Sequence, residues 1–156
     1  MEQTIAELMG ADQRRLEVLW AQCLEAIERF DLKAVRELFN IFSQGFRRHI
    51  EVEERIFFPA FEAREGADGS QRTAAMCSEH REIAAMIEQL SVLKTARDHS
   101  TLTVTVAGQP CDPTTLFQSH NAKEAFLHSM MDAAFAPDER SKLLEQARER
   151  LAAKPA

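Results

Sequence analysis

The sequence predicts an all-α protein, an up-down-up-down four-helix bundle with a short C-terminal helix. Helix-forming residues are abundant, Tyr is absent, and Gly and Pro number only five each. Apolar residues recur every three or four positions over long stretches, which are joined mainly by short turns, so neighbouring helices should be antiparallel. Because 156 residues with 45% hydrophobic content suffice for one buried core, we expect a single domain over residues 1–156.

The first two helices have clear start and stop signals. Thr4 and Glu7 have the spacing of a capping box, and the first helix is expected to end near Phe30. Its apolar face comprises Met9, Leu16, Trp20, Cys23 and Ile27. Asp31 can cap the second helix, which should stop at the turn signals of residues 65–69. The apolar positions of this helix are Val35, Phe39, Phe42, Phe46, Ile56, Phe57 and Ala60.

The second half of the chain predicts two more bundle helices and the C-terminal one. The third helix carries Met76, Ile83, Ile87 and Leu90, and its end is poorly marked. In residues 101–108, β-branched and apolar residues alternate as in a short strand. No partner strand is evident, so we treat this segment as a long connection. Asp112-Pro113 is a good start for the fourth helix, and Pro137-Asp138 for the last. Their apolar positions are Phe117, Leu127, Met131 and Phe135, then Leu143, Leu144, Ala147 and Leu151.

Charge and cysteine usage exclude several classes of function. The net charge is −6 and no basic run is present, which disfavours binding to nucleic acid or to an anionic membrane. Three cysteines are an odd number without the spacing of a disulfide framework, and neither a signal peptide nor a long apolar run is recognisable. We therefore expect a cytoplasmic protein with free thiols.

Polar residues interrupt the apolar stripes at a few positions and should point into the core. They are Gln13 in the first helix, His49 and Glu53 in the second, His80 in the third, and His120 and Glu124 in the fourth. Burying one unpartnered polar side chain costs on the order of 1–3 kcal/mol, and a carboxylate costs more. One His-x-x-x-Glu pair alone would be an ion pair, but two such pairs with a further histidine predict a bound cation. Imidazole with carboxylate suits iron, manganese or zinc, and a bridged metal pair in a helical bundle favours iron or manganese.

Other polar residues near the stripes have less certain roles. His128 continues the face of Glu124 by one turn, so it is a ligand, a residue that orients a ligand, or an edge residue. Glu54 and Glu79 flank inward positions and are expected at the surface, although either could orient a ligand. Cys77 lies one turn before His80 and could approach the site, but an inert buried thiol is expected there. His99 should be solvated among polar neighbours, and the phenylalanines of the second helix are core packing.

Three segments carry a family resemblance. HIEVEERIFFPAFE (49–62), SEHREI (78–83) and SHNAKE (119–124) resemble the hemerythrin-like, or HHE cation-binding, family, in order along essentially the whole chain. The resemblance implies a four-helix bundle in which two glutamates bridge two irons. The ligands that it implies are His49, Glu53, His80, His120 and Glu124.

The chain departs from the family pattern in two places. In ADQRRLEVL (11–19), Gln13 stands where the family has a ligand histidine. The resemblance implies that one iron takes His49 and His80, and the other takes His120 and that missing histidine. Gln13 could ligate through its amide oxygen, His128 could supply the nitrogen, or only one iron could bind. After Glu124 the chain reads AFLHSMMD (125–132), where the family usually has a second glutamate and a Leu-Tyr-Pro-like run, so this part of the pocket should be reshaped.

The resemblance implies three classes of function. The first is binding or sensing of dioxygen, nitric oxide or peroxide, since the family is associated with oxygen binding, iron sensing and repair of iron–sulfur clusters. The second is a di-iron peroxidase or oxidase, for which the sequence has no separate acid and base residues. The third is a metal-poor interaction module, which Gln13 supports. We expect a binding or sensing protein, with a small ligand in an apolar lining formed by Phe42, Phe46, Phe57, Ile83 and Phe117.

Overall fold

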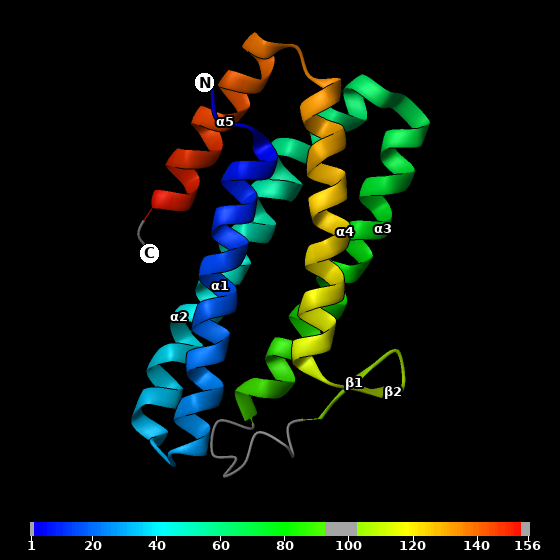
Figure 1. Ribbon diagram of the computed structural model, residues 1–156. Helices are drawn as coiled ribbons and strands as arrows, with labels where there is room; N and C mark the ends of the chain where they lie inside the picture. Colours follow the sequence, from blue (N-terminus) through cyan, green and yellow to red (C-terminus); the bar gives the residue numbers. More distant parts are fainter. Residues whose placement is uncertain (1, 93–102, 154–156) are drawn as a thin grey trace.

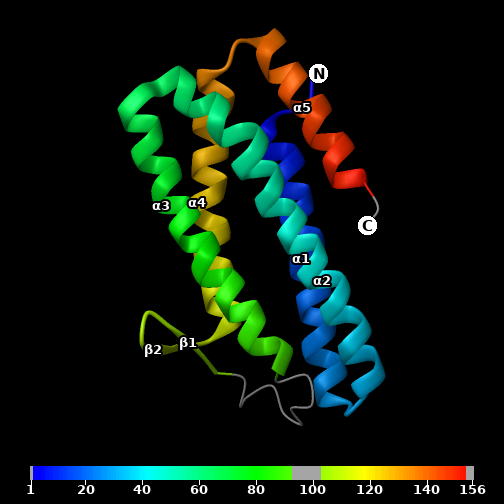
Figure 2. The same cartoon turned by 180° about the vertical axis from the view of Figure 1, so that it is seen from behind.

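The computed structural model describes residues 2–92 and 103–153, and it confirms an all-α bundle. The elements are α1 (Ile5–Glu28), α2 (Leu32–Val52), the π-helical turn η1 (Glu53–Phe57), α3 (Phe58–Val92), β1 (Val104–Val106), β2 (Gln109–Cys111), α4 (Pro113–Ala134) and α5 (Pro137–Ala152). The long helices α1 to α4 lie side by side, as Figure 1 shows, and α5 packs beside them near the N-terminus. The view from behind in Figure 2 shows the same arrangement.

The helix starts follow the predicted capping residues. Thr4 and Glu7 form a reciprocal capping box, with the Glu7 amide donating to the Thr4 hydroxyl at 3.1 Å and the Thr4 amide donating to the Glu7 carboxylate at 2.9 Å. The side chain of Asp31 caps α2 and that of Asp112 caps α4, and Pro137 is the first residue of α5. These local signals fix where each helix begins, and therefore which residues face the core.

Two apolar clusters form the core. One is built around Trp20, Phe42 and Phe117, whose ring centroids lie 5.2 to 5.5 Å apart. The other includes Met9, Val52, Phe57, Phe58, Phe61, Met131 and Leu144. Several buried polar side chains occupy helix positions between residues of the two clusters, for example Gln13 between Met9 and Leu16 in α1. Apolar residues on both sides therefore keep water away from them.

The π-helical turn shifts the apolar stripe of the second helical segment by one residue. Ile56 and Ala60 were expected in the core, but both are only half-buried. Phe58 and Phe61 are buried instead, beside Phe57. A π turn holds one residue more than an α turn, so every later side chain moves one position along the stripe. Ile56 and Ala60 therefore lie at the edge of the core, packed against the second cluster.

The chain between α2 and α4 differs from expectation in two details. The break expected at residues 65–69 is a kink within α3, where Gly66 has a φ of 64°. The strand expected without a partner has one, because β1 pairs antiparallel with β2 in a hairpin that places Val104 opposite Cys111. Gln89 of α3 holds this hairpin through two hydrogen bonds of 2.9 Å with the backbone of Thr105. His99 lies outside the described residues.

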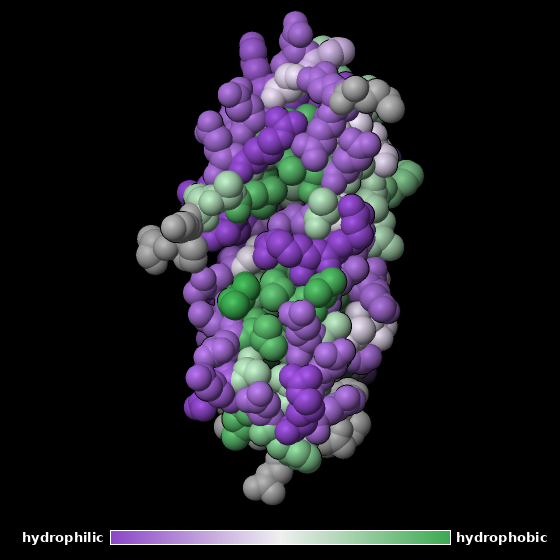
Figure 3. Space-filling view, turned by 60° about the vertical axis from the view of Figure 1, so that its left-hand side comes forward, coloured by the Kyte–Doolittle hydropathy of each residue, from purple (hydrophilic) through white to green (hydrophobic). Residues whose placement is uncertain are grey.

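The surface is largely polar. The face shown in Figure 3 is mainly hydrophilic, with smaller hydrophobic patches between the polar side chains. Among residues 2–92 and 103–153, no helix has both the length and the apolar character needed to cross a membrane.

Candidate metal centre

Seven polar side chains from all four bundle helices and the π turn meet inside the protein. They are Gln13 of α1, His49 of α2, Glu53 of η1, His80 of α3, and His120, Glu124 and His128 of α4. None is more than 7% exposed, and the two glutamates are fully buried. The structure thus brings together all five residues expected as ligands and both additional candidates. His128, whose orientation the sequence left open, points inward.

Glu124 occupies the middle of this cluster. Its Oε1 lies 3.1 Å from Nε2 of His80 and also contacts Nε2 of His120. Its Oε2 lies 3.1 Å from Nε2 of His49 and accepts a hydrogen bond from the Gln13 amide. The two oxygens of this carboxylate therefore face different side chains.

Glu53 divides its contacts in the same way. Its Oε2 lies 3.1 Å from Nε2 of His80. Its Oε1 lies 2.6 Å from Nε2 of His128 and 3.8 Å from Nε2 of His49. Both glutamates therefore span the cluster from one group of side chains to the other.

The contacts divide the cluster into two halves. The first half contains His80 and His120, whose ring centroids lie 5.1 Å apart. The second half contains His49, His128 and Gln13. The resemblance implied a different pairing, His49 with His80 and His120 with the first-helix position, whereas the contacts between the side chains group His80 with His120. Helical spacing gives the height of a side chain along its own helix, but it does not give the rotation of one helix against another.

A carboxylate lies behind each of three histidines, at the ring nitrogen that faces away from the cluster. Nδ1 of His49 lies 2.8 Å from Asp12, that of His80 lies 2.9 Å from Glu54, and that of His120 lies 3.5 Å from Glu79. Carboxylates in this position fix the ring orientation and the tautomer of metal-binding histidines, leaving Nε2 free to ligate. Glu54 and Glu79, expected mainly at the surface, thus contact the two histidines of the first half.

Asp12 was not singled out from the sequence. It is buried, and its other oxygen accepts hydrogen bonds of 2.9 and 3.1 Å from Arg15. The sequence nevertheless indicates that Asp12 faces inward, because it lies three positions after Met9 and four before Leu16, on the same stripe as Gln13.

The charges in the cluster shift the pKa values of its members in opposite directions. Burial lowers the pKa of His49, but the charges of Glu53 and Glu124 outweigh it and raise that pKa well above its ordinary value. Burial also lowers the pKa of His80, but its interactions with Glu124 and Glu53 outweigh this and raise that pKa to about 10. Burial raises the pKa of Glu124, but His49, His120 and His80 more than offset it and leave that pKa well below its ordinary value. The protein alone thus balances its buried carboxylates with imidazolium charge.

Several buried atoms lack hydrogen-bond partners among the described residues. They include Oε2 of Glu53, both ring nitrogens of His120 and Nδ1 of His128. One ligand atom each from His80, His120 and Glu124 lies within 4.8 Å of the others, and the same holds for His49, Glu53 and Glu124. Buried imidazoles and carboxylates that converge without full hydrogen bonding fit a cation, which satisfies their lone pairs together.

A small cavity adjoins the second half of the cluster. Its volume is about 10 Å³, and it is lined by Gln13 and His49 of the cluster. The other lining residues are the apolar Leu16, Phe42, Phe46 and Phe117 and the polar Glu17 and Asn121. Asn121 donates a hydrogen bond of 2.7 Å to Glu17 and so links α4 to α1 there. Three of the five residues expected as an apolar lining, Phe42, Phe46 and Phe117, border this space.

The comparison with known protein families identifies the cluster. The family described as Hemerythrin HHE cation binding domain matches residues 4–127, a stretch that holds six of the seven clustered side chains, with His128 one residue beyond it. Searches of curated proteins and of solved structures returned no significant match. Because the family match spans more than half of the chain and includes both His-x-x-x-Glu pairs, the chain belongs to the Hemerythrin HHE cation binding domain family.

Proposed function

We propose that the protein binds a pair of iron ions and uses them to bind or sense a small ligand such as dioxygen, nitric oxide or peroxide. The observation that carries this proposal is the position of Glu53 and Glu124. Both are fully buried, and each directs its two oxygens at histidines of different halves. Carboxylates so placed suit the bridging of two metals, and bundle sites built from Glu and His typically hold iron or manganese. Zinc is the remaining alternative.

The two halves would hold one metal each. In the first half the nitrogen ligands would be His80 and His120, and in the second His49 and His128. Gln13 would add its amide oxygen to the second half, which requires its amide group to turn from the orientation that donates to Glu124. Nε2 of His128 already lies 2.6 Å from Glu53, so His128 is well placed to replace the histidine that the family has at position 13.

A small ligand fits the site better than a substrate-sized molecule. A bound iron pair supplies an open coordination position at which such a ligand can attach. The adjoining cavity of about 10 Å³ has room for roughly one water molecule. Its phenylalanine side chains restrict water, and they leave no space for a larger substrate without rearrangement. This favours binding or sensing over the alternative of a di-iron peroxidase or oxidase with an organic substrate.

Metal analysis of protein purified from iron-replete cells tests the proposal. We expect two irons per chain and an optical spectrum that changes on exposure to air. Manganese or zinc at the same stoichiometry would replace iron in the proposal. Protein that carries no metal and takes up none on reconstitution would contradict it and favour the interaction module. Rapid consumption of peroxide with a reductant would favour the enzyme.

Replacing His128 tests the composition of the second half. His128→Ala is expected to lower the iron content from two to one per chain, because the first half keeps His80, His120 and both glutamates. Gln13→His in the same chain should restore the second iron, since it returns the family's histidine. Leu127→Ala is the matched control, because it empties a neighbouring buried position of α4 without removing a nitrogen. Two irons in His128→Ala would rule out ligation by His128.

Three further expectations belong with this proposal. We infer that the helices follow the up-down-up-down order and that residues 1–156 form one domain, in keeping with the short connections at the other helix ends and the long one between α3 and α4. We also propose that the protein works in the cytoplasm, where its three cysteines, all free, would stay reduced.

A further inference from the structure

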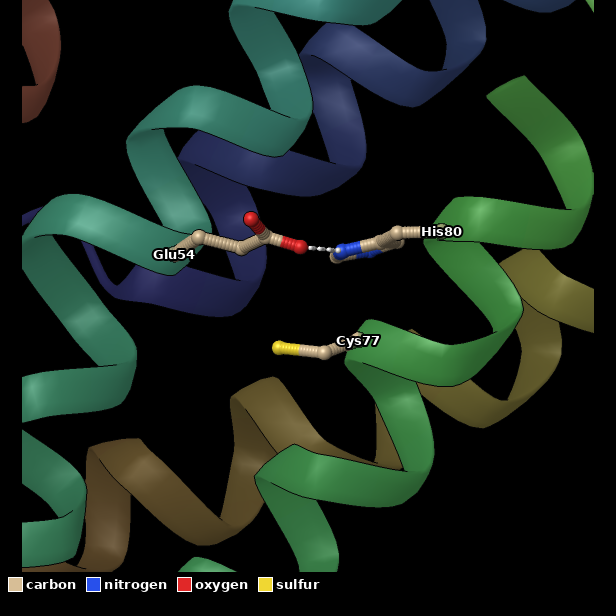
Figure 4. Close-up of side chains that lie close together, drawn as sticks. All are labelled: Glu54, Cys77 and His80. Carbon is tan, nitrogen blue, oxygen red and sulfur yellow. Dashed lines mark hydrogen bonds and ion pairs between the residues drawn. The ribbon is translucent and has the colours of Figure 1, made fainter. Parts of the chain in front are cut away.

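A second group of metal-ligand types lies on the outer side of His80. Glu54 of η1 and Cys77 of α3 lie close to the His80 ring, as Figure 4 shows. The buried glutamates contact Nε2 of that ring, whereas Glu54 contacts Nδ1. The Glu54 carboxylate lies 2.9 Å from Nδ1 of His80. One ligand atom from each of Glu54, Cys77 and His80 lies within 4.8 Å of the other two. We call these three residues the outer triad.

The local geometry explains why these side chains meet. Cys77 and His80 are three residues apart in α3, so they share one face of that helix. Glu53 and Glu54 are consecutive at the start of the π turn, and they approach His80 from opposite sides, at Nε2 and Nδ1 respectively. His80 therefore stands between the buried cluster and the outer triad.

The outer triad can be reached from solvent, unlike the buried cluster. The Glu54 side chain is 38% exposed and Cys77 is half-buried, whereas His80 is 2% exposed. Burial, with the nearby charge of Glu54, raises the pKa of the Cys77 thiol to about 11. The free thiol is therefore protonated at neutral pH, and a thiolate at this position would indicate a bound cation.

We propose that the outer triad is a zinc-binding site of its own, formed by the Cys77 sulfur, Nδ1 of His80 and the Glu54 carboxylate. One thiolate, one imidazole and one carboxylate are the ligand types that Zn²⁺ accepts in tetrahedral sites, and the thiolate selects against manganese and magnesium. Three protein ligands leave the fourth position to solvent, so this zinc exchanges readily. On binding, the thiol proton and the proton on Nδ1 of His80 would be released to solvent, and the hydrogen bond between Glu54 and His80 would be replaced by two bonds to the metal.

The outer site would compete with the buried one, a consequence that rests on the proposed function. A neutral imidazole that ligates through Nδ1 keeps its proton on Nε2. Nε2 of His80 would then donate that proton toward Glu53 or Glu124 and could not ligate an iron in the first half. Zinc outside and iron inside thus compete for the neutral imidazole of His80, and by linkage each lowers the affinity of the other by the same factor.

Titration of cobalt(II) into the metal-free full-length protein tests the outer site, because cobalt–thiolate charge transfer gives an absorption band that the sulfur-free buried cluster cannot give. We expect this band in the wild type, its loss on adding zinc, and its absence in Cys77→Ser. Cys111→Ser is the matched control, a half-buried cysteine in β2 whose loss should leave the band unchanged. Glu54→Gln should weaken zinc binding roughly tenfold or more. A wild type without the band, or an equal band in Cys77→Ser, would overturn the outer site.

A second measurement separates this inference from the proposed function. Iron uptake is followed in the presence of one equivalent of zinc, in the wild type and in Cys77→Ser. We expect zinc to reduce the iron content of the wild type more than that of Cys77→Ser, because only the wild type holds zinc at the outer triad. Equal reduction in both would contradict competition through His80. A protein that binds no iron yet shows the cobalt–thiolate band retains the outer site while losing the proposed function, and iron loading without the band gives the reverse result.

Discussion

Glu124→Gln is expected to abolish metal binding, lowering the metal content from two per chain to nearly none. Glu124 contacts histidines of both halves and Gln13, so its replacement affects both metal positions at once. The amide removes a negative charge from a fully buried position and offers one oxygen in place of two. It also leaves imidazolium groups without their partner, which typically costs about 3–5 kcal/mol of folding stability.

Metal analysis, with circular dichroism to show that the variant remains folded, measures this effect. Glu79→Gln is the control, because it removes a carboxylate that lies 3.5 Å from Nδ1 of His120 without touching the centre of the cluster. That variant should keep both metals at lower affinity, by about 10 to 100-fold. Two tightly bound metals in folded Glu124→Gln would show that the cation is held elsewhere.

The metal-free protein is expected to lose stability as the pH rises from about 6.5 to about 10. In the folded protein the pKa of His80 is raised to about 10, and that of His49 is also raised. Their contribution to folding stability is therefore complete below 6.5, the pKa of histidine in the unfolded state, and is lost as the pH rises toward the pKa in the folded state. The pKa of Glu124 is lowered, so its contribution is present above 4.5 and fades as the pH falls below that. The free energy of unfolding should therefore be greatest between pH 4.5 and pH 6.5, the pKa values of Glu and His in the unfolded state. At alkaline pH it should fall by a few kcal/mol.

Urea unfolding of chelator-treated protein at several pH values measures this loss. The protein loaded with metal should behave in the opposite way, because metal ligation requires neutral imidazoles and acid releases the metal. His80→Gln removes one of the titrating groups and should flatten the alkaline slope. A metal-free wild type that is equally stable near neutral pH and at alkaline pH would contradict the assigned imidazolium charges.

Regular helices made the buried cluster predictable from the sequence. His49 with Glu53, and His120 with Glu124, are four residues apart in segments whose apolar neighbours recur at helical spacing, so their inward direction follows from periodicity alone. The same rule applies to Asp12, but an acidic residue next to Gln13 and two arginines reads as part of a solvated face. Burial of that carboxylate depends on His49, which belongs to another helix.

The remaining features depend on contacts that spacing does not encode. No residue type in Glu53–Phe57 distinguishes a π turn from an α turn, so the one-residue shift of the phenylalanine stripe could not be read from the sequence. The partner strand β2 contains Pro110 and spans only three residues, too few for an alternating pattern. The strands are joined through Ala107 and Gly108, both with positive φ, and only Gly108 gives a signal in the sequence.

The wide turn at Glu53–Phe57 accommodates one extra residue without moving the metal centre. Arg55 is 75% exposed and pairs only with Glu51 among the described residues, so exchanging it for another polar residue disturbs little. Deleting it would convert the π turn into an ordinary α turn, and Glu53 and the phenylalanines that follow would keep their inward positions. If the turn became α-helical at its full length instead, the helix on one side of it would rotate by about 100°, and either Glu53 or the phenylalanines would leave the interior. Homologues that lack one residue here should therefore keep the same ligand set with an ordinary α turn in this place.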